Sequence, residues 1–421
     1  MWHLWKMKIF KSIAFAAAAA SLAACGIIKE SALSADEPDL LMFGQELSFF
    51  SKCNVEAVLL GEGDSLVAVS PKYQARVLTS TFGGAGGYSL GWINHELLAD
   101  NKIGLQTSQA GGEDRFWIGP QGGDFSIFFP MGAVYSEENW KAPEELSSEP
   151  WTLVARSKTR ARFEKIADFD NVKGTRFKVK AEREITVLSR KNVSEILGIE
   201  IPDSVKLVAF QSFNRLTNTG DAKWDADRGM LNISVQSCFN ANKNARVFIP
   251  YKQGEVSKLG EVLRDNFFDT ASGEGRLVVD PAYISFKTDG KNMSGIGVSG
   301  RRSEGIAISY DATNRVLTVV IYVKPSVGRG YLQNAWRRSG GDQFDGDAIS
   351  VYNNGPLART SVSADRFYEI STHSPALELA PAHTQVHLQR TFHFGGSEYD
   401  LGLIAYKLAG LSIGQLRGES E

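Results

Sequence analysis

The strongest constraint on the fold is the repeated alternation of short apolar or β-branched runs with turn residues. Residues 54–60 form one such run and are followed by Gly61-Glu62-Gly63-Asp64, and residues 315–323 form another. Short, partly alternating runs bounded by turn residues are typical of β-strands. Their spacing suits a large antiparallel sandwich. The sequence therefore predicts an all-β fold, a large antiparallel two-sheet β-sandwich.

The rest of the chain follows the same pattern. Helical periodicity is scarce, with one short helix expected around residues 257–264 and a short helix or strand within residues 89–98. No internal repeat or Pro/Ser-rich linker divides residues 41–410, so a single domain is expected there. Further strands are expected at residues 175–180, 183–188 and 277–279.

Composition narrows the class of protein. The chain has 421 residues, of which 43% are apolar, so a sizeable core is available. Its formal net charge is −2, and no run of lysine or arginine stands out. Nucleic acid is therefore not expected as a partner.

The N-terminus carries a targeting pattern. Three lysines precede an apolar run over residues 13–24, which is too short to span a bilayer but suits a signal-peptide core. The run ends in Leu22-Ala23-Ala24-Cys25-Gly26, which resembles the bacterial lipoprotein signal. That resemblance implies a signal peptide over residues 1–24 and a lipidated Cys25. The alternative is an ordinary signal peptide with an incidental cysteine.

The lipoprotein interpretation sets the expected surroundings of the protein. It predicts a tether over residues 25–40, a polar tail over residues 411–421, and a lipid anchor as the sole membrane contact. The expected location is the periplasm or the cell surface, with the outer membrane favoured. Export leaves Cys53 and Cys238 either paired in a disulfide or buried as separate thiols. The sequence leaves the oligomeric state open.

The histidines are concentrated near the C-terminus. Four of the six lie within residues 367–394. Residues 383–394 alternate, and a strand sends the two parities to opposite faces. The apolar parity is expected to pack inward and the polar parity to line the other face. The polar parity comprises His383, Gln385, His387, Gln389, Thr391 and His393.

This alternation argues against a metal site. His383 and His387 are four residues apart, about 13 Å on a strand at roughly 3.3 Å per residue. One strand cannot bring both to a common ion, so no metal is expected. Two interpretations remain. One is a polar strand face without a binding or catalytic role, and the other is a surface that recognises sugar hydroxyl groups.

The residues around Glu369 carry a resemblance to a known family. The order Tyr368-Glu369-Ile370-Ser371-Thr372-His373, then Ser374-Pro375, Leu379-Ala380-Pro381 and a His/Arg/Phe-rich strand is similar to the C-terminal part of the galactose mutarotase (aldose 1-epimerase) superfamily. It looks closest to uncharacterised mutarotase-like bacterial lipoproteins. The resemblance implies that Glu369 is the catalytic base. The alternative is a strand-face glutamate paired with an arginine.

The same resemblance leaves the general acid open. Residues 208–220 look like the central strand of the family, in which a histidine follows the position of Asn218. Here Thr219-Gly220-Asp221 stands there instead. His95 and His387 are the candidates for the acid, and His373 is a weaker one because strand geometry separates it from Glu369.

Two clusters are candidates for substrate binding. Residues 111–123 include Glu113, Arg115 and Trp117, which could hydrogen-bond or stack on a sugar. Tyr352 and Asn353 follow an aspartate- and glycine-rich stretch, and together with His373 complete the expected set. The alternatives are a structured loop for the first cluster and a turn for the second. Asp342, Asp345 and Asp347 could suggest calcium, but their spacing is not that of an EF-hand.

These features predict an exported lipoprotein that acts on or binds carbohydrate. The expected chemistry is aldose epimerase-like, without a cofactor. The alternative is a non-catalytic carbohydrate-binding accessory protein of polysaccharide uptake. The sequence names no particular sugar.

Overall fold

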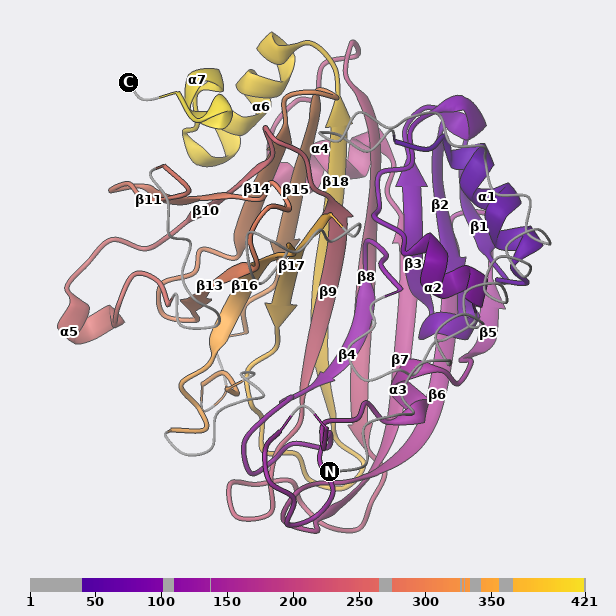
Figure 1. The fold of residues 1–421 in the computed structure, drawn as a ribbon, viewed down its shortest axis with the longest axis vertical. Coiled ribbons are helices and arrows are strands. Elements are labelled where there is room, and N and C mark those ends of the chain that lie inside the picture. The colour runs from indigo at the N-terminus through magenta and orange to yellow at the C-terminus, as the bar shows by residue number, and fades with distance from the viewer. Residues whose placement is uncertain are drawn as a thin grey trace, which may run out of the picture.

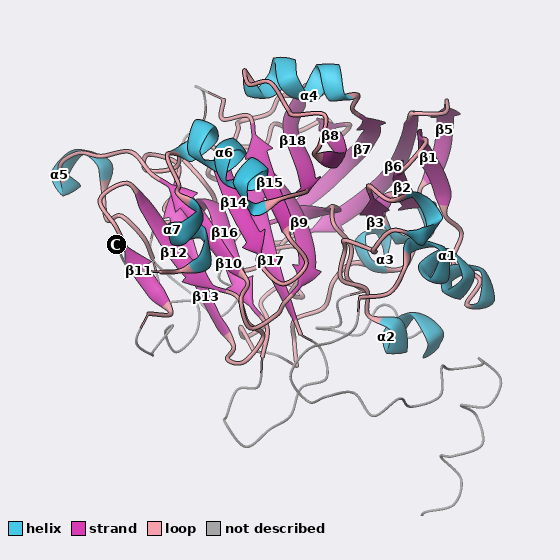
Figure 2. Cartoon of the chain, turned by 90° about the horizontal axis from the view of Figure 1, so that it is seen from above, coloured by secondary structure: helices cyan, strands magenta, loops and turns pink. Residues whose placement is uncertain are grey.

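Antiparallel β-sheets make up most of the molecule. The computed structural model describes residues 40–100, 110–136, 138–264, 275–325, 328, 330–333, 342–355 and 366–419. Its strands form sheets of ten, five and three strands. The two larger sheets lie face to face, and the smallest lies at one side of them (Figures 1 and 2). The predicted all-β antiparallel sandwich is confirmed.

The ten-stranded sheet is the larger layer. The segments expected as two strands at residues 175–180 and 183–188 are one continuous strand in it, and the expected strand at residues 277–279 is its edge. Its strands, in order across the sheet, are β11 (Leu277–Val279), β12 (Tyr283–Lys287), β10 (Arg246–Pro250), β14 (Ile306–Asp311), β15 (Val316–Tyr322), β18 (Thr384–Gly395), β8 (Lys206–Asn218), β7 (Arg176–Val187), β6 (Arg160–Asp170) and β5 (Thr152–Arg156).

The five-stranded sheet packs on the larger one through polar as well as apolar contacts. The hydroxyl groups of Tyr368 and Ser309 are 2.6 Å apart, and the Gln389 amide donates to Ser237 Oγ at 3.0 Å. These bonds cross between the layers, so they fix which face of the smaller sheet looks inward. Its strands, in order, are β13 (Ser294–Ser299), β16 (Asp347–Asn353), β17 (Phe367–His373), β9 (Asn232–Asn240) and β4 (Arg115–Gly119).

The third sheet and two helices form the N-terminal part of the described chain. Its strands are β1 (Val58–Glu62), β2 (Ser65–Ser70) and β3 (Arg76–Thr81), so the run expected at residues 54–60 becomes a strand only from Val58. Helices α1 (Phe43–Lys52) and α2 (His95–Asp100) lie beside them (Figure 1). α1 buries Phe43 and Phe50 fully, which stabilises the fold by about 1.5–3 kcal/mol for each side chain.

Helices cover the outer face of the ten-stranded sheet. α4 (Arg190–Leu197), α6 (Glu398–Ala409) and α7 (Ile413–Arg417) share one apolar cluster with Phe392 and Phe394 of β18. Ser397 caps the start of α6, and Gly410, at φ 70°, ends it in the left-handed region that favours glycine. The short elements are α3 (Glu144–Ser147), α5 (Val256–Leu259), η1 (Pro71–Tyr73) and η2 (Gly84–Gly86).

The C-terminal stretch corrects one expectation. Residues 411–421 were expected to be a polar tail, but Leu411 and Leu416 are fully buried under α6 and α7. The sequence pattern was too short to show this packing. Within the described ranges, none of the helices combines the length and the apolar character that a membrane crossing needs. Residues 1–39, with Cys25, lie outside the described residues.

The orientation of β18 also differs from the expectation. The alternation is present, but the set of side chains that includes His387 and His393 faces the five-stranded sheet. His387 and His393 are each only 1% exposed. On the opposite parity, Val386 is 47% exposed, whereas Phe392 and Phe394 are buried under helices. Groups on other strands hydrogen-bond the inward-pointing side chains of His387, Gln389 and His393, which removes part of the cost of burying them.

Candidate functional site

The outer face of the five-stranded sheet, turned away from the ten-stranded sheet, carries a set of polar side chains that we call the polar face. Residues opposite each other on adjacent strands project from the same face, and every second residue along a strand shares it. Ser237 points inward to Gln389, so its neighbours on β9 point outward. The register then gives the polar face: Arg115, Trp117, Ser234, Gln236, Cys238, Ser350, Tyr352, Glu369, Ser371 and His373.

Glu369 is the central acidic group of the polar face. It is 7% exposed and lies opposite Cys238 on β9 and Tyr352 on β16. Ser371 donates its hydroxyl to Glu369 Oε1 at 2.5 Å, and the Cys238 sulfur lies 3.8 Å from Oε2. Both carboxylate oxygens are therefore held by neighbours on the sheet, so the group has a fixed orientation.

The charge of Glu369 affects two neighbouring groups. Burial lowers the pKa of Arg115 to about 10, and the negative charge of Glu369 opposes that shift. Burial raises the pKa of the Cys238 thiol well above its usual range, and the Glu369 charge raises it further. At neutral pH the polar face therefore carries a guanidinium cation, a protonated thiol and polar neutral groups around one glutamate.

His373 lies on the same face as Glu369 but at a distance along β17. Burial lowers its pKa to about 4, so the imidazole is neutral near pH 7. Its Nε2 lies 3.5 Å from Ser350 Oγ. Four residues on a strand span about 13 Å, so one atom cannot contact both His373 and Glu369. The sequence predicted this separation, and the strand assignment confirms its premise.

Aromatic side chains flank the polar face at two ends. Trp117 on β4 has the Arg115 guanidinium 3.8 Å from its ring centroid and stacks on Phe128 at 5.2 Å. At the Glu369 end, Trp92 stacks on Phe367 at 4.1 Å in a cluster that includes Cys238. The aromatic groups that the sequence offered for sugar stacking are thus already in contact with protein side chains.

His387 lies on the other side of the five-stranded sheet from Glu369. Its Nε2 is 2.8 Å from Thr372 Oγ1, and Thr372 has the parity of β17 that faces inward. Burial lowers the pKa of His387 to about 3, and the nearby His373 lowers it further. The structure therefore does not bring His387 and Glu369 to a common point, and the acid role of His387 stays a prediction.

The other predicted residues are dispersed. His95 lies on α2, where its Nε2 is 2.8 Å from Glu46 Oε2. Asn353 is fully buried, accepts from the Gly290 amide at 2.9 Å and donates to the Asn292 carbonyl at 2.8 Å, which is a structural role in a turn. Tyr352 reaches the polar face from β16.

A buried hydrogen-bond network accounts for Glu113, the last of the predicted binding residues. Glu113 Oε2 lies 2.8 Å from His393 Nε2, and His393 Nδ1 lies 2.8 Å from Thr318 Oγ1. Ser80 donates both its amide and its hydroxyl to Glu113 at 2.5 and 2.8 Å. Glu113 is fully buried. It joins β3, β15 and β18 inside the molecule instead of lining the polar face.

Asp114 extends the network next to Glu113. Its carboxylate forms an ion pair with Arg183 on β7, and both side chains are fully buried. Asp114 Oδ2 accepts from Ser212 Oγ at 2.8 Å and from the Gln389 amide at 3.3 Å. The sequence did not identify Arg183 or Ser212, because a charged or polar residue in an alternating strand is normally predicted to face solvent.

Two of the three aspartates that suggested calcium, Asp345 and Asp347, lie next to an arginine. Arg264 pairs with Asp345, and its second terminal nitrogen lies 3.6 Å from Asp347 Oδ1. Across the described ranges, no three His, Cys, Asp or Glu side chains are arranged so that they could hold a metal ion. Within the described ranges, Cys53 and Cys238 are not joined in a disulfide.

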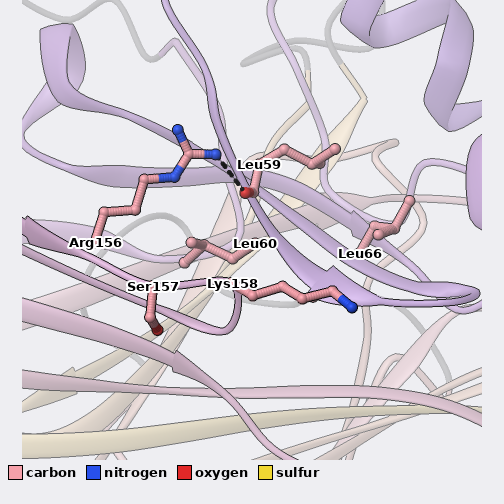
Figure 3. Close-up of a pocket in the computed structure, with 7 residues that line it drawn as sticks. Leu59, Leu60, Leu66, Arg156, Ser157 and Lys158 are labelled. Atoms are coloured by element: carbon pink, nitrogen blue, oxygen red, sulfur yellow. Dashed lines mark hydrogen bonds between the residues drawn. The ribbon is translucent and has the colours of Figure 1, made fainter.

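A hollow of about 380 Å³ lies elsewhere on the surface, between β1, β2 and the turn from β5 to β6. Figure 3 shows Arg156 reaching over it to the Leu59 carbonyl, which accepts a hydrogen bond at 3.1 Å. Leu60, Leu66 and Lys158 also line it. Its walls carry two cationic side chains, Arg156 and Lys158, and no acidic side chain, so the arrangement offers no acid/base pair.

A model of a family of unknown function (DUF6786) matches residues 41–419. The chain belongs to this family. No curated protein matches the DUF6786 chain. The match spans nearly all of the described residues, so the sandwich and the C-terminal helices belong to one family unit.

Solved structures similar to this DUF6786 protein carry aldose 1-epimerase and galactose mutarotase names. A candidate aldose 1-epimerase from Escherichia coli K12 shares 10% identity at TM-score 0.48, covering 80% of this chain and 99% of that one. A candidate aldose 1-epimerase from Klebsiella pneumoniae shares 10% identity at TM-score 0.46, covering 88% of this chain and 91% of that one. A galactose mutarotase-like protein from Lactobacillus casei shares 9% identity at TM-score 0.44, covering 80% of this chain and 100% of that one. At these identities and TM-scores, the similarity assigns no chemistry to a residue of this chain.

Proposed function

We propose that the polar face binds a saccharide and that Glu369 acts as the base in an aldose 1-epimerase-type interconversion of anomers. The observation that carries this proposal is the fixed position of Glu369 among buried hydrogen-bonding groups. Ser371 holds one carboxylate oxygen at 2.5 Å and Cys238 lies 3.8 Å from the other. A saccharide offers several hydroxyl groups that can donate to such a carboxylate and accept from neighbouring donors.

The proposed chemistry needs one base and one acid. Glu369 takes the proton of the anomeric hydroxyl while an acid protonates the ring oxygen, and the bond between the anomeric carbon and the ring oxygen breaks. The ring oxygen, now a hydroxyl group, attacks the other face of the open-chain carbonyl and closes the ring as the other anomer. Each proton transfer of this kind contributes roughly 10²–10⁴-fold. Both protons return to their donors, so the enzyme is regenerated.

A second candidate function is saccharide binding without catalysis. Among the described residues, no histidine contacts the Glu369 carboxylate: His373 is four positions along β17, and His387 lies behind the sheet. The imidazole of His373 is neutral near pH 7, since its pKa is about 4. This arrangement favours a carbohydrate-binding accessory protein of polysaccharide uptake, in which Glu369 is a ligand contact.

We also propose that the protein is exported and anchored by a lipid on Cys25. The support is the Leu22-Ala23-Ala24-Cys25-Gly26 sequence after a short apolar run. The sandwich would then work in the periplasm or at the cell surface, with the outer membrane favoured. A protein tethered at its N-terminus meets extracellular or periplasmic sugars, which fits both candidate functions.

The test of binding is calorimetric titration of purified protein with glucose, galactose, mannose, xylose and arabinose. Cys238→Met adds bulk beside Glu369 without charge and is expected to lower the affinity at least tenfold. Cys53→Met, at the end of α1, is the matched control and keeps the wild-type affinity. Thermal melting of both variants checks that they fold. Loss of binding in both variants alike would contradict the polar face as the site.

A further inference from the structure

Three buried polar atoms lie side by side at one end of the polar face. They are the indole nitrogen of Trp117, the hydroxyl oxygen of Ser234 and the amide oxygen of Gln236. Within the part of the chain that the structure describes, none has a hydrogen-bond partner. Their side chains are 2%, 2% and 6% exposed. A buried polar atom without a partner costs about 1–3 kcal/mol, so three together point to a missing ligand.

The register places the three side chains in one patch, which we call the distal patch. Trp117 on β4 lies opposite Ser234 on β9, and Gln236 follows two residues later on the same strand and face. The patch offers an N–H donor, a hydroxyl that can donate or accept, and a carbonyl acceptor. Adjacent hydroxyl groups on a pyranose ring match that mixture, since each can donate and accept.

Trp117 and Ser234, at the far end of the distal patch, are too far from Glu369 for one sugar ring, whereas Gln236 lies in between, opposite Ser371. Cys238 lies opposite Glu369, and Ser234 is four residues from Cys238 on β9. That separation is about 13 Å along the strand, and Trp117 lies one strand further, about 5 Å to the side. The distance exceeds the width of a single pyranose ring, so one ring cannot contact Glu369 and Trp117 together.

We infer that the polar face takes an oligosaccharide, with its terminal sugar at Glu369 and the following sugars at the distal patch. The inference rests on the proposed saccharide site and adds the class of ligand. The terminal sugar places its free anomeric carbon at Glu369, and the next residues reach Gln236, Ser234 and Trp117. Arg115, opposite Gln236, lies between the two ends of the site.

Trp117 contacts a ligand at this subsite through the edge of its indole ring. The Arg115 guanidinium lies 3.8 Å from the ring centroid, and Phe128 stacks on the ring at 5.2 Å. The indole N–H therefore is the part of Trp117 that a ligand hydroxyl group uses. Replacing tryptophan by phenylalanine removes that N–H and keeps an aromatic ring against Phe128.

The experiment compares sugars of increasing length by calorimetric titration of the wild-type protein and two variants. The probes are glucose, maltose, maltotriose, cellobiose and cellotriose, with xylose, xylobiose and xylotriose as a second series. Trp117→Phe removes the distal N–H. Trp140→Phe is the matched control, because Trp140 stacks on the far partner Phe128 at 5.3 Å. Gln236→Leu is the second test variant.

The wild type is expected to bind the trisaccharide of at least one series tenfold or more tighter than the matching monosaccharide. Trp117→Phe removes that gain and keeps the monosaccharide affinity, Gln236→Leu also removes the gain, and Trp140→Phe keeps both affinities. Equal affinity for mono- and trisaccharides contradicts the oligosaccharide inference and leaves the proposed saccharide site standing. A gain that survives Trp117→Phe and Gln236→Leu also contradicts it. Binding of no sugar in either series contradicts both.

Discussion

The sulfur of Cys238 lies 3.8 Å from Oε2 of Glu369, across the pair of strands β9 and β17. Burial and the glutamate charge raise the pKa of this thiol well above its usual range. A protonated thiol can donate weakly to the carboxylate, whereas a thiolate would repel it. Cys238 therefore contacts Glu369 Oε2 without adding a second anion beside it.

Alkylation of Cys238 tests its raised pKa. We expect iodoacetamide to modify Cys238 more slowly than the half-buried Cys53, because the thiolate is the nucleophile and burial disfavours it. The rate at Cys238 keeps rising above pH 9, past the usual thiol range. Mass spectrometry of digests taken over time at several pH values gives both rates. A rate that levels off near pH 8.5 would contradict the raised pKa.

The low pKa of His387 makes stability depend on pH. Its pKa is about 3 when folded, against the ordinary value of 6.5 for a solvated imidazole, so unfolding below pH 6.5 takes up a proton. The stability that the neutral imidazole gives is present above pH 6.5 and is lost as the pH falls toward 3. The loss is about 1.4 kcal/mol per pH unit for one such group. His373, with a pKa of about 4, acts in the same direction.

The measurement is urea unfolding of wild type and His387→Gln at pH 7, 6, 5 and 4.5. The variant is expected to lose less stability on acidification than the wild type, although it is less stable at pH 7. His383→Gln is the matched control, since His383 is exposed and lies four residues before His387 in the sequence. A pH slope in His387→Gln equal to that of the wild type would show that His387 does not titrate as described.

The Asp114–Arg183 pair is expected to be sensitive to loss of one partner. Arg183→Met leaves the buried Asp114 carboxylate without its cation and costs about 3–5 kcal/mol of unfolding free energy. Asp114→Asn combined with Arg183→Met is expected to cost less, because no uncompensated charge remains. Arg176→Met, on the same strand but with exposed partners at 3.0–3.1 Å, is expected to leave the free energy of unfolding almost unchanged, because solvent screens exposed ion pairs. Equal losses at Arg183 and Arg176 would contradict a buried pair.

The lipid anchor is tested at Cys25. Cys25→Ala is expected to release the protein from the membrane fraction or to leave the precursor uncleaved, because the thiol is the lipidation point in this type of signal. Membrane fractionation and the mass of the mature N-terminus give the result. Cys53→Ala is the control for loss of a thiol as such. Normal maturation of Cys25→Ala in the membrane fraction would contradict the lipoprotein proposal.

The sequence predicted the strands well but not which side of them faces inward. The alternation over residues 383–394 was correct, yet hydrophobicity alone chose the wrong inner face. The inward side chains of His387, Gln389 and His393 find hydrogen-bond partners in distant segments. These partners are Thr372, Asp114, Glu113 and Thr318. No local pattern shows that these partners meet, so the inward turn of His387 follows only from the three-dimensional arrangement.

The helices and the candidate site show the same limit. α6 has a start signal at Ser397 and a stop signal at Gly410, yet the sequence analysis did not identify this helix. Glu369, Arg115 and Trp117 were found from motifs, and the structure brings them to one face of the sheet. Cys238 and Gln236 reach that face through the register of β9, which the sequence does not reveal.

The most direct test of the account is the conversion of anomers by wild type and Glu369→Gln. The amide keeps the shape of the side chain and removes the base, so binding of sugars is expected to survive. Proton NMR of freshly dissolved α-anomers, with each protein at matched concentration, follows the reaction. The account predicts that wild type accelerates conversion of at least one sugar and that Glu369→Gln loses at least a hundredfold of that acceleration. Equal acceleration by both proteins would remove Glu369 from catalysis, and sugar binding without acceleration by wild type would favour the accessory-protein function instead.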